Sequence, residues 1–305
     1  MTLTTRKYLY IAAGILVVAA VLYFSVFRES AVIVEAALVS RGPVTASINA
    51  EGKTRYHDRY TITAPVSGKM FRIQLHEGDR VPKGFVLTRI DPAPPRPLNP
   101  AETPQGGTFP YAYNVFVPED GLLTKILVAS EGIVQAGTPI AEVSKPSYLE
   151  VIADVLSADA TQIRPHMLVR IENWGGDGAL TARVRTVEPQ AFTKVSALGV
   201  EEQRVNVIVD FDKIPENLGD NYRVDVGIVL WEGKDVLRVP SSALFRTADT
   251  WSVYVVERGK AIPRTVEVGH RSPSFVEVTS GLTDGETVIL HPPSSITDGS
   301  RVTAR

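Results

Sequence analysis

Apolar and polar side chains alternate in short runs along most of the chain. Runs rich in β-branched and aromatic residues occupy 32–34, 60–62, 205–209, 251–256 and 286–290. Each is bounded by Gly, Pro, Asn, Asp or Ser, a pattern typical of strands joined by turns. Helical periodicity is found at 157–163, where we expect Ser157 to cap a short helix that ends before Pro165. The pattern therefore predicts a mainly β protein built from small barrels or sandwiches.

One apolar segment departs from this alternation. Residues 8–27 are 20 consecutive positions without a charged side chain. As a helix they would span roughly 30 Å, the thickness of the hydrocarbon core of a membrane. Arg6 and Lys7 precede the segment, so we expect the tail 1–7 to stay in the cytoplasm and the rest of the chain to lie outside. A cleaved signal peptide is the alternative, but the apolar stretch is long for one, and we predict a single-pass inner-membrane anchor.

An internal repeat is the most specific feature of the sequence. The first copy contains Pro65, Gly68, Gly78 and Gly84, and the second contains Pro118, Gly121, Gly132 and Gly137. In both copies proline stands three residues before the first glycine, and the last glycine follows the first by 16 residues. Each copy predicts three short strands separated by turns that need glycine. Half a sandwich cannot bury its own apolar face, so the two copies should pack against each other.

The repeat resembles the two half-motifs of a lipoyl or biotinyl carrier domain. In that family the halves meet at a hairpin that bears a modified lysine. The segment 91–114, which joins the halves here, contains no lysine, and Lys69 and Lys83 lie elsewhere in the first copy. The resemblance therefore implies a lipoyl-like fold without swinging-arm chemistry.

Composition narrows the functional classes. The length of 305 residues suggests about two domains. A formal net charge of -2 shows no basic excess, so no nucleic-acid partner is expected. The chain has no cysteine, which excludes disulfide scaffolds, thiolate zinc sites, cysteine nucleophiles and an acylated lipoprotein anchor.

Motifs for enzymatic chemistry are missing from the sequence. The histidines are His57, His76, His166, His270 and His291, and their spacing fits no metal motif. No nucleophile elbow, P-loop or EF-hand loop occurs, and the glycine-rich run 174–178 predicts a hairpin turn between 169–171 and 182–184. We therefore predict a non-enzymatic protein with no catalytic, cofactor-binding or metal site and with no cofactor.

A split lipoyl-like sandwich behind a single N-terminal anchor resembles the periplasmic adaptors, also called membrane fusion proteins, of the haemolysin-secretion type. The resemblance covers roughly residues 8–305. The segment 148–155 looks like the entry to the family's β-barrel domain, and 192–205 is similar to a loop-and-strand signature of these adaptors. The segment 239–245 looks like the crossing into the membrane-proximal domain, whose closing turns match glycines at 281, 285 and 299.

The resemblance implies a domain layout. A cytoplasmic tail (1–7) and a transmembrane anchor (8–27) would be followed by a lipoyl-like domain (61–147), whose halves are joined by the loop 91–114. A β-barrel domain would occupy 148–235. A membrane-proximal β domain would combine 32–60 with 236–305.

The resemblance also implies a function and partners. The chain would be a periplasmic adaptor in efflux or secretion, docking an inner-membrane transporter of the ABC or RND type and forming a homo-oligomer, with an outer-membrane channel as a further partner. One feature departs from the family, whose lipoyl halves are usually separated by a long helical hairpin. The separator 91–114 contains seven prolines and cannot form such a hairpin. An adaptor-derived envelope scaffold or sensor without a channel contact is therefore the alternative.

A cluster of charged side chains within the 192–205 signature is a candidate docking surface. It combines Glu201 and Glu202 with Lys194 and Arg204. The alternative interpretation is a solvated strand edge whose charges serve solubility alone.

Overall fold

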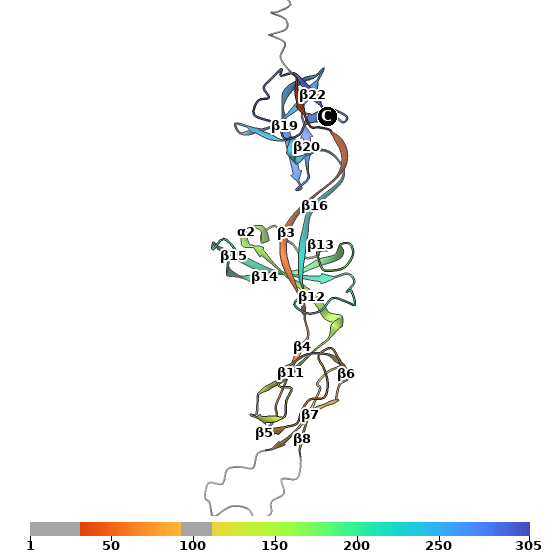
Figure 1. Ribbon diagram of the computed structural model, residues 1–305, viewed down its shortest axis with the longest axis vertical. Helices are drawn as coiled ribbons and strands as arrows, with labels where there is room; N and C mark the ends of the chain where they lie inside the picture. Colours follow the sequence, from red (N-terminus) through yellow and green to blue (C-terminus); the bar gives the residue numbers. More distant parts are fainter. Residues whose placement is uncertain (1–30, 93–111) are drawn as a thin grey trace, which may run out of the picture. The chain divides into compact units, whose positions relative to one another are not determined.

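The computed structural model describes residues 31–92 and 112–305 (Figure 1). These form two compact units: one is Ser47–Leu230, and the other joins the described residues up to Ala46 with Trp231–Arg305. The predicted anchor at 8–27 lies outside the described residues. In the part of the chain that is described, no helix is both long and apolar enough to cross a membrane.

The prediction of a mainly β protein is confirmed. Helical structure in the described ranges is limited to α2 (Ser157–Ala160) and the 3-10 turns η2 (Pro146–Tyr148) and η3 (Ser241–Ala243). The helix expected at 157–163 is thus a single turn. The prediction that Ser157 caps it is wrong, because Leu156 holds the cap position without a side-chain hydrogen bond and Ser157 is already helical.

The repeat forms two four-stranded sheets. The first copy supplies β4 (Arg59–Thr63), β5 (Gly68–Met70), β6 (Arg80–Val81) and β7 (Val86–Pro92). The second supplies β8 (Tyr113–Phe116), β9 (Gly121–Ile126), β10 (Gly132–Val134) and β11 (Pro139–Ser144). The strand orders are β10-β5-β7-β8 and β4-β11-β9-β6, so each sheet takes two strands from each copy.

This exchange of strands buries the apolar faces of both copies in one core. The side chains of Met70, Ile90, Leu123 and Ile140 have no exposed surface there. The expectation that the two halves pack against each other is confirmed.

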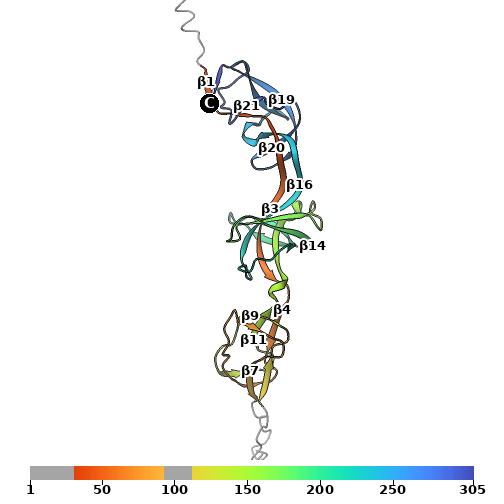
Figure 2. The same cartoon turned by 90° about the vertical axis from the view of Figure 1, so that its right-hand side faces the viewer.

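A closed sheet forms the rest of this unit. Its strands are β12 (Leu149–Leu156), β13 (Leu168–Glu172), β14 (Leu180–Val195) and β15 (Glu201–Phe211), with parts of β3 (Ser40–Tyr56) and β16 (Arg223–Pro240). Figure 2 shows β3 and β16 side by side, in agreement with their pairing. The order β13-β14-β15-β12-β3-β16 closes because β16 also pairs with β13. Small apolar residues at alternate positions of the strands fill the ring, as Val151, Ala153 and Val155 do on β12.

The glycine-rich run 174–178 lies in the turn between β13 and β14, as expected. Val169 pairs with Ala182 in this hairpin. The Trp174 indole N–H donates to the carbonyl of Gly178 at 2.9 Å, and the ring covers Gly176. The turn is therefore organised by its own tryptophan.

The other unit contains the first and the last described strands. Besides parts of β3 and β16, its strands are β1 (Val32–Val34), β2 (Ala36–Leu38), β17 (Phe245–Thr247), β18 (Thr250–Glu257), β19 (Lys260–Arg271), β20 (Phe275–Ser280), β21 (Thr287–Ile289) and β22 (Val302–Ala304). β1 pairs in parallel with β22, Val32 opposite Val302. Gly281, Gly285 and Gly299 have positive φ angles, as the predicted closing turns require.

Candidate functional site

The two repeat copies interlock through equivalent glycines. A Cβ on Gly68 would lie 2.0 Å from the carbonyl oxygen of Asp91, and a Cβ on Gly121 would lie 2.6 Å from that of Ser144. Each glycine therefore sits where its strand crosses another backbone too closely for any side chain. This explains why the first glycine recurs in both copies.

The residue before each of these glycines binds the opposite copy. The Ser67 hydroxyl accepts the amide N–H of Ala136 at 2.9 Å, and the Asp120 carboxylate accepts that of Lys83 at 2.7 Å. The last glycine of each copy also donates its amide N–H to a carbonyl of the other copy at 2.8 Å. The equivalent bonds give the sandwich approximate internal two-fold symmetry.

The two lysines of the first copy are held in ion pairs. Lys69 lies 2.5 Å from Glu131 and Lys83 lies 2.7 Å from Glu119. The hydrogen bond to Glu131 raises the pKa of Lys69, and the bond to Glu119 raises the pKa of Lys83. Both ion pairs join a lysine of the first copy to a glutamate of the second copy, so these lysines contribute to the contact between the two halves.

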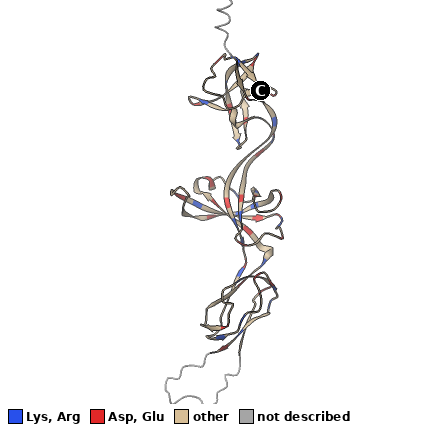
Figure 3. Ribbon diagram, viewed as in Figure 1, with Lys and Arg blue, Asp and Glu red and all other residues tan. Residues whose placement is uncertain are grey.

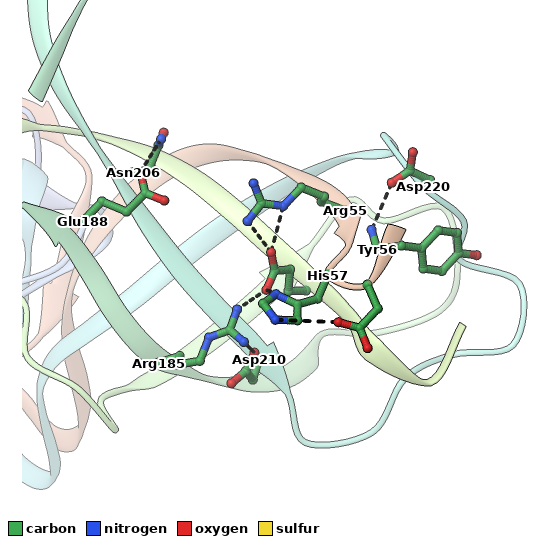
Figure 4. A network of polar contacts seen from close by, with 10 residues as sticks. Arg55, Tyr56, His57, Arg185, Glu188, Asn206, Asp210 and Asp220 are labelled. Atoms are coloured by element: carbon green, nitrogen blue, oxygen red, sulfur yellow. Dashed lines mark hydrogen bonds and ion pairs between the residues drawn. The ribbon is translucent and has the colours of Figure 1, made fainter. Parts of the chain in front are cut away.

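A buried carboxylate is the focus of the polar network drawn in Figure 4. Glu150, on β12, has 1% of its side chain exposed. Arg55 donates from Nε at 2.8 Å and makes a second, shorter bond to the same oxygen. Arg185 binds the other oxygen, and the His57 ring nitrogen Nδ1 lies 3.2 Å from it.

Burial alone would raise the pKa of the Glu150 carboxyl. The hydrogen bonds and charges of Arg55 and Arg185 outweigh burial, so the pKa lies below its ordinary value. The carboxylate joins three strands of the closed sheet and is ionised at neutral pH. It is placed to fix the pairing of these strands, and no hydroxyl or amine nucleophile is among the groups that bind it.

The structure brings together Lys194, Glu202 and Arg204 of the candidate docking surface, whereas Glu201 pairs with Val195 in the sheet and makes no ion pair among the described residues. Lys194 and Arg204 both bind Asp154 on β12, the latter at 3.0 Å, and Arg204 also binds Glu202 at 2.7 Å. Asp154 was missed from the sequence because it lies 50 residues from Arg204 along the chain. These internal pairs satisfy Lys194, Arg204 and Glu202, which favours the interpretation as a solvated strand edge.

The histidines do not gather into one site. His57 belongs to the Glu150 network, whereas the His270 ring stacks on Trp231 at 3.7 Å and binds the Glu277 carboxylate at 2.8 Å. Within the described ranges no group of three or more His, Asp or Glu side chains is arranged to hold a metal ion.

Acidic and basic residues are interspersed over both units, with most of the ribbon formed by uncharged residues (Figure 3). In the unit that contains Trp231–Arg305, here called the C-terminal unit, two arginines lie over the ring of Trp251. Their guanidinium carbons are 5.3 Å (Arg246) and 4.3 Å (Arg271) from the ring centroid. Sequence reasoning missed this group, because the two arginines are 25 residues apart and only the folded sheet brings them to one ring.

The C-terminal part of the chain matches one family model and one named protein. Residues 236–304 match the family model described as YknX, C-terminal permuted SH3-like domain. A stretch of 64 residues is 38% identical to the Bacillus subtilis (strain 168) protein named "Putative efflux system component YknX". The match covers 21% of this chain and 17% of that protein, so the chain matches less than a fifth of the length of this relative.

Two solved structures share the fold over most of the chain. MacA from Actinobacillus actinomycetemcomitans is 19% identical with a TM-score of 0.59, and the match covers 84% of this chain and 99% of that one. A MacA-MexA chimera containing the Pseudomonas aeruginosa MexA alpha-hairpin domain is 19% identical with a TM-score of 0.54, covering 83% and 99%. At 19% identity these likenesses show the shared fold, and together with the C-terminal match to an efflux component they confirm, at the level of fold, the predicted resemblance to periplasmic adaptors, or membrane fusion proteins.

Proposed function

We propose that this chain is a non-enzymatic periplasmic adaptor subunit of a transmembrane efflux or secretion system. It docks an inner-membrane transporter of the ABC or RND type and couples it to export across the envelope. Residues 8–27 anchor it in the inner membrane as a single pass, with the N-terminus cytoplasmic and the bulk of the chain periplasmic. An outer-membrane channel is a further partner of the assembly.

The observation that supports this proposal best is the fold shared with MacA over 84% of the chain. We assign the interleaved sandwich to the predicted lipoyl-like domain (61–147), the closed sheet to the predicted β-barrel domain (148–235) and the unit that holds both β1 and β22 to the predicted membrane-proximal domain (32–60 with 236–305). Residues 47–60 of the last range belong to the compact unit that contains the closed sheet and the sandwich. The YknX-type domain match at 236–304 supports the last assignment independently.

The proposed mechanism is assembly. The membrane-proximal and β-barrel domains bind the transporter, and the lipoyl-like domains of a homo-oligomer pack into a ring around the exported substrate. Each domain has its own buried core, as the sandwich and the closed sheet show. Such rigid modules transmit movement of the transporter without chemical steps of their own.

Deletion of residues 1–27 tests the proposal. The remaining chain should stay soluble and rich in β-structure by circular dichroism, and, when immobilised, it should retain the transporter from a detergent extract of the native membrane. The matched control is a chain that also carries Gly68→Ala, which disturbs the sandwich but leaves the transporter-binding domains unchanged. A soluble, folded chain that retains no transporter under any salt condition would contradict the proposal.

A further inference from the structure

Trp251 is flanked by arginines from two separate segments of the C-terminal unit. Arg246, on β17, is directly opposite Trp251 on β18, and Arg271 reaches the same ring from the end of β19. The indole packs partly against the core of this unit, whereas both arginine side chains are exposed. The result is a fixed aromatic platform with two guanidinium groups at the surface.

These two charges are not neutralised within the described chain. Arg246 and Arg271 have no carboxylate within ion-pair distance among the residues that the structure describes, whereas Arg264 of β19 lies 2.5 Å from both Glu257 and Glu286. Contact with an aromatic ring stabilises a cation but leaves its charge uncompensated. Two like charges drawn to one ring also repel each other, which an anion between them would relieve.

The two guanidinium groups suit anionic oxygen ligands, carboxylates among them. A guanidinium group that lies over an aromatic ring keeps N–H donors free at its rim, where they can bind a carboxylate in a bidentate pair. Tryptophan and arginine are also the residue types most enriched among the energetically dominant residues of protein interfaces. An acidic segment of a protein partner meets both requirements.

The position of the group on its strand argues against lipid headgroups. Val32 of β1, which follows the proposed anchor, pairs with Val302, and Val302 donates its amide N–H to the carbonyl of Gly259 beyond the end of β18. Trp251 stands six residues before Glu257 on β18, or about 20 Å at the rise of a strand. The described part of the chain therefore begins at the opposite end of β18 from the two arginines, and the proposed anchor precedes that end.

We propose that Arg246, Trp251 and Arg271 form a docking site for an acidic segment of the transporter's external domain. This inference rests on the proposed function and adds the chemistry of the partner surface. Reversing both charges (R246E/R271E) should lower transporter binding by about a hundredfold or more, because each truncated interfacial charge typically costs tenfold or more. R246K/R271K should bind at an intermediate level, because lysine keeps the charge but loses the planar fork.

The test is a photocrosslink in the full-length chain in native membranes. A photoreactive phenylalanine replaces Thr247, which is exposed and adjacent to Arg246. Mass spectrometry should identify a crosslink to an Asp- or Glu-rich segment of a transporter, which is lost in R246E/R271E and weakened by high salt. The charge-matched control R258E/R301E changes two exposed arginines of the same unit and should keep the crosslink.

The outcomes separate the two proposals. A transporter that co-purifies equally with wild type and R246E/R271E would overturn the docking site while leaving the adaptor function intact. A crosslink from position 247 to lipid, or to a second copy of this chain, would also overturn the site. Wild-type chain that captures no transporter at all would contradict the adaptor function, and the docking site with it.

Discussion

Replacing Arg55 and Arg185 together with alanine should destabilise the closed sheet more than removing the carboxylate that they bind. Glu150 is 1% exposed, whereas the two arginine side chains are 44% and 36% exposed. The double substitution leaves a buried carboxylate with His57 as its nearest remaining partner. Breaking a buried pair in this way costs about 3–5 kcal/mol, and we expect the lower end because water reaches the arginine side of the network.

Glu150→Gln should cost only about 1–2 kcal/mol. The amide keeps one acceptor for Arg55, and both arginines remain hydrated because they are partly exposed. Adding Glu150→Gln to the chain that already lacks Arg55 and Arg185 should therefore restore stability, since it removes the unpaired buried charge. The same substitution thus lowers the stability of the wild-type chain but raises that of the chain lacking both arginines, as expected for a buried carboxylate that needs its partners.

Hydrogen–deuterium exchange of the β12 amides measures this local stability in the full chain. A loss of about 3 kcal/mol corresponds to roughly a hundredfold faster exchange, since 1.4 kcal/mol is tenfold. Amides of β18, in the other unit, serve as the internal control and should be unchanged. If Glu150→Gln does not slow exchange of the β12 amides in the chain that lacks both arginines, then the unpaired Glu150 carboxylate is not what destabilises the sheet.

The remaining predictions concern the sandwich, the turn between β14 and β15, and the dependence of stability on pH. Gly68→Ala should lower the melting temperature of the sandwich core, because its Cβ would lie 2.0 Å from the Asp91 carbonyl oxygen and the strands must separate; an unchanged melting temperature would contradict the close approach. Leu198→Ser should leave thermal stability within about 0.5 kcal/mol, because the side chain is 91% exposed; a large loss would place it in a core. Burial tends to raise the pKa of Glu277, but bonds from the His270 amide and ring outweigh it and lower that pKa. Pairing of β19 with β20 should therefore be intact above the ordinary carboxyl pKa and weaken as pH falls through the lowered value, and Glu277→Gln should remove this dependence in amide exchange.

The repeat could be predicted from the sequence because its constraints are local. Positive φ angles at Gly84 and Gly137 and backbone crossings at Gly68 and Gly121 each demand glycine at a fixed spacing. What the spacing does not reveal is the exchange of strands between copies. That depends on bonds such as Ser67 to Ala136, which join residues 69 apart.

The charged networks were harder to predict for the same physical reason. Glu150 lies 95 residues from Arg55 and 35 from Arg185, and nothing in the local pattern marks an acid within a strand as buried. Ser157 was misassigned because a serine before a helical run is a common cap, whereas here the strand runs to Leu156 and the helix starts at Ser157. Local sequence patterns predict where strands and turns lie, whereas the contacts between polar residues depend on the pairing of strands that are far apart in the chain.

Crosslinked affinity purification can show whether this chain is an adaptor docked to a transporter. The full-length chain, tagged at its C-terminus, is crosslinked in native membranes and purified under denaturing conditions, and its partners are identified by mass spectrometry against an untagged control. We expect an inner-membrane transporter as the dominant partner, with an outer-membrane channel in the same complex. Crosslinks to envelope proteins that include no transporter would contradict this expectation and would support a scaffold or sensor instead.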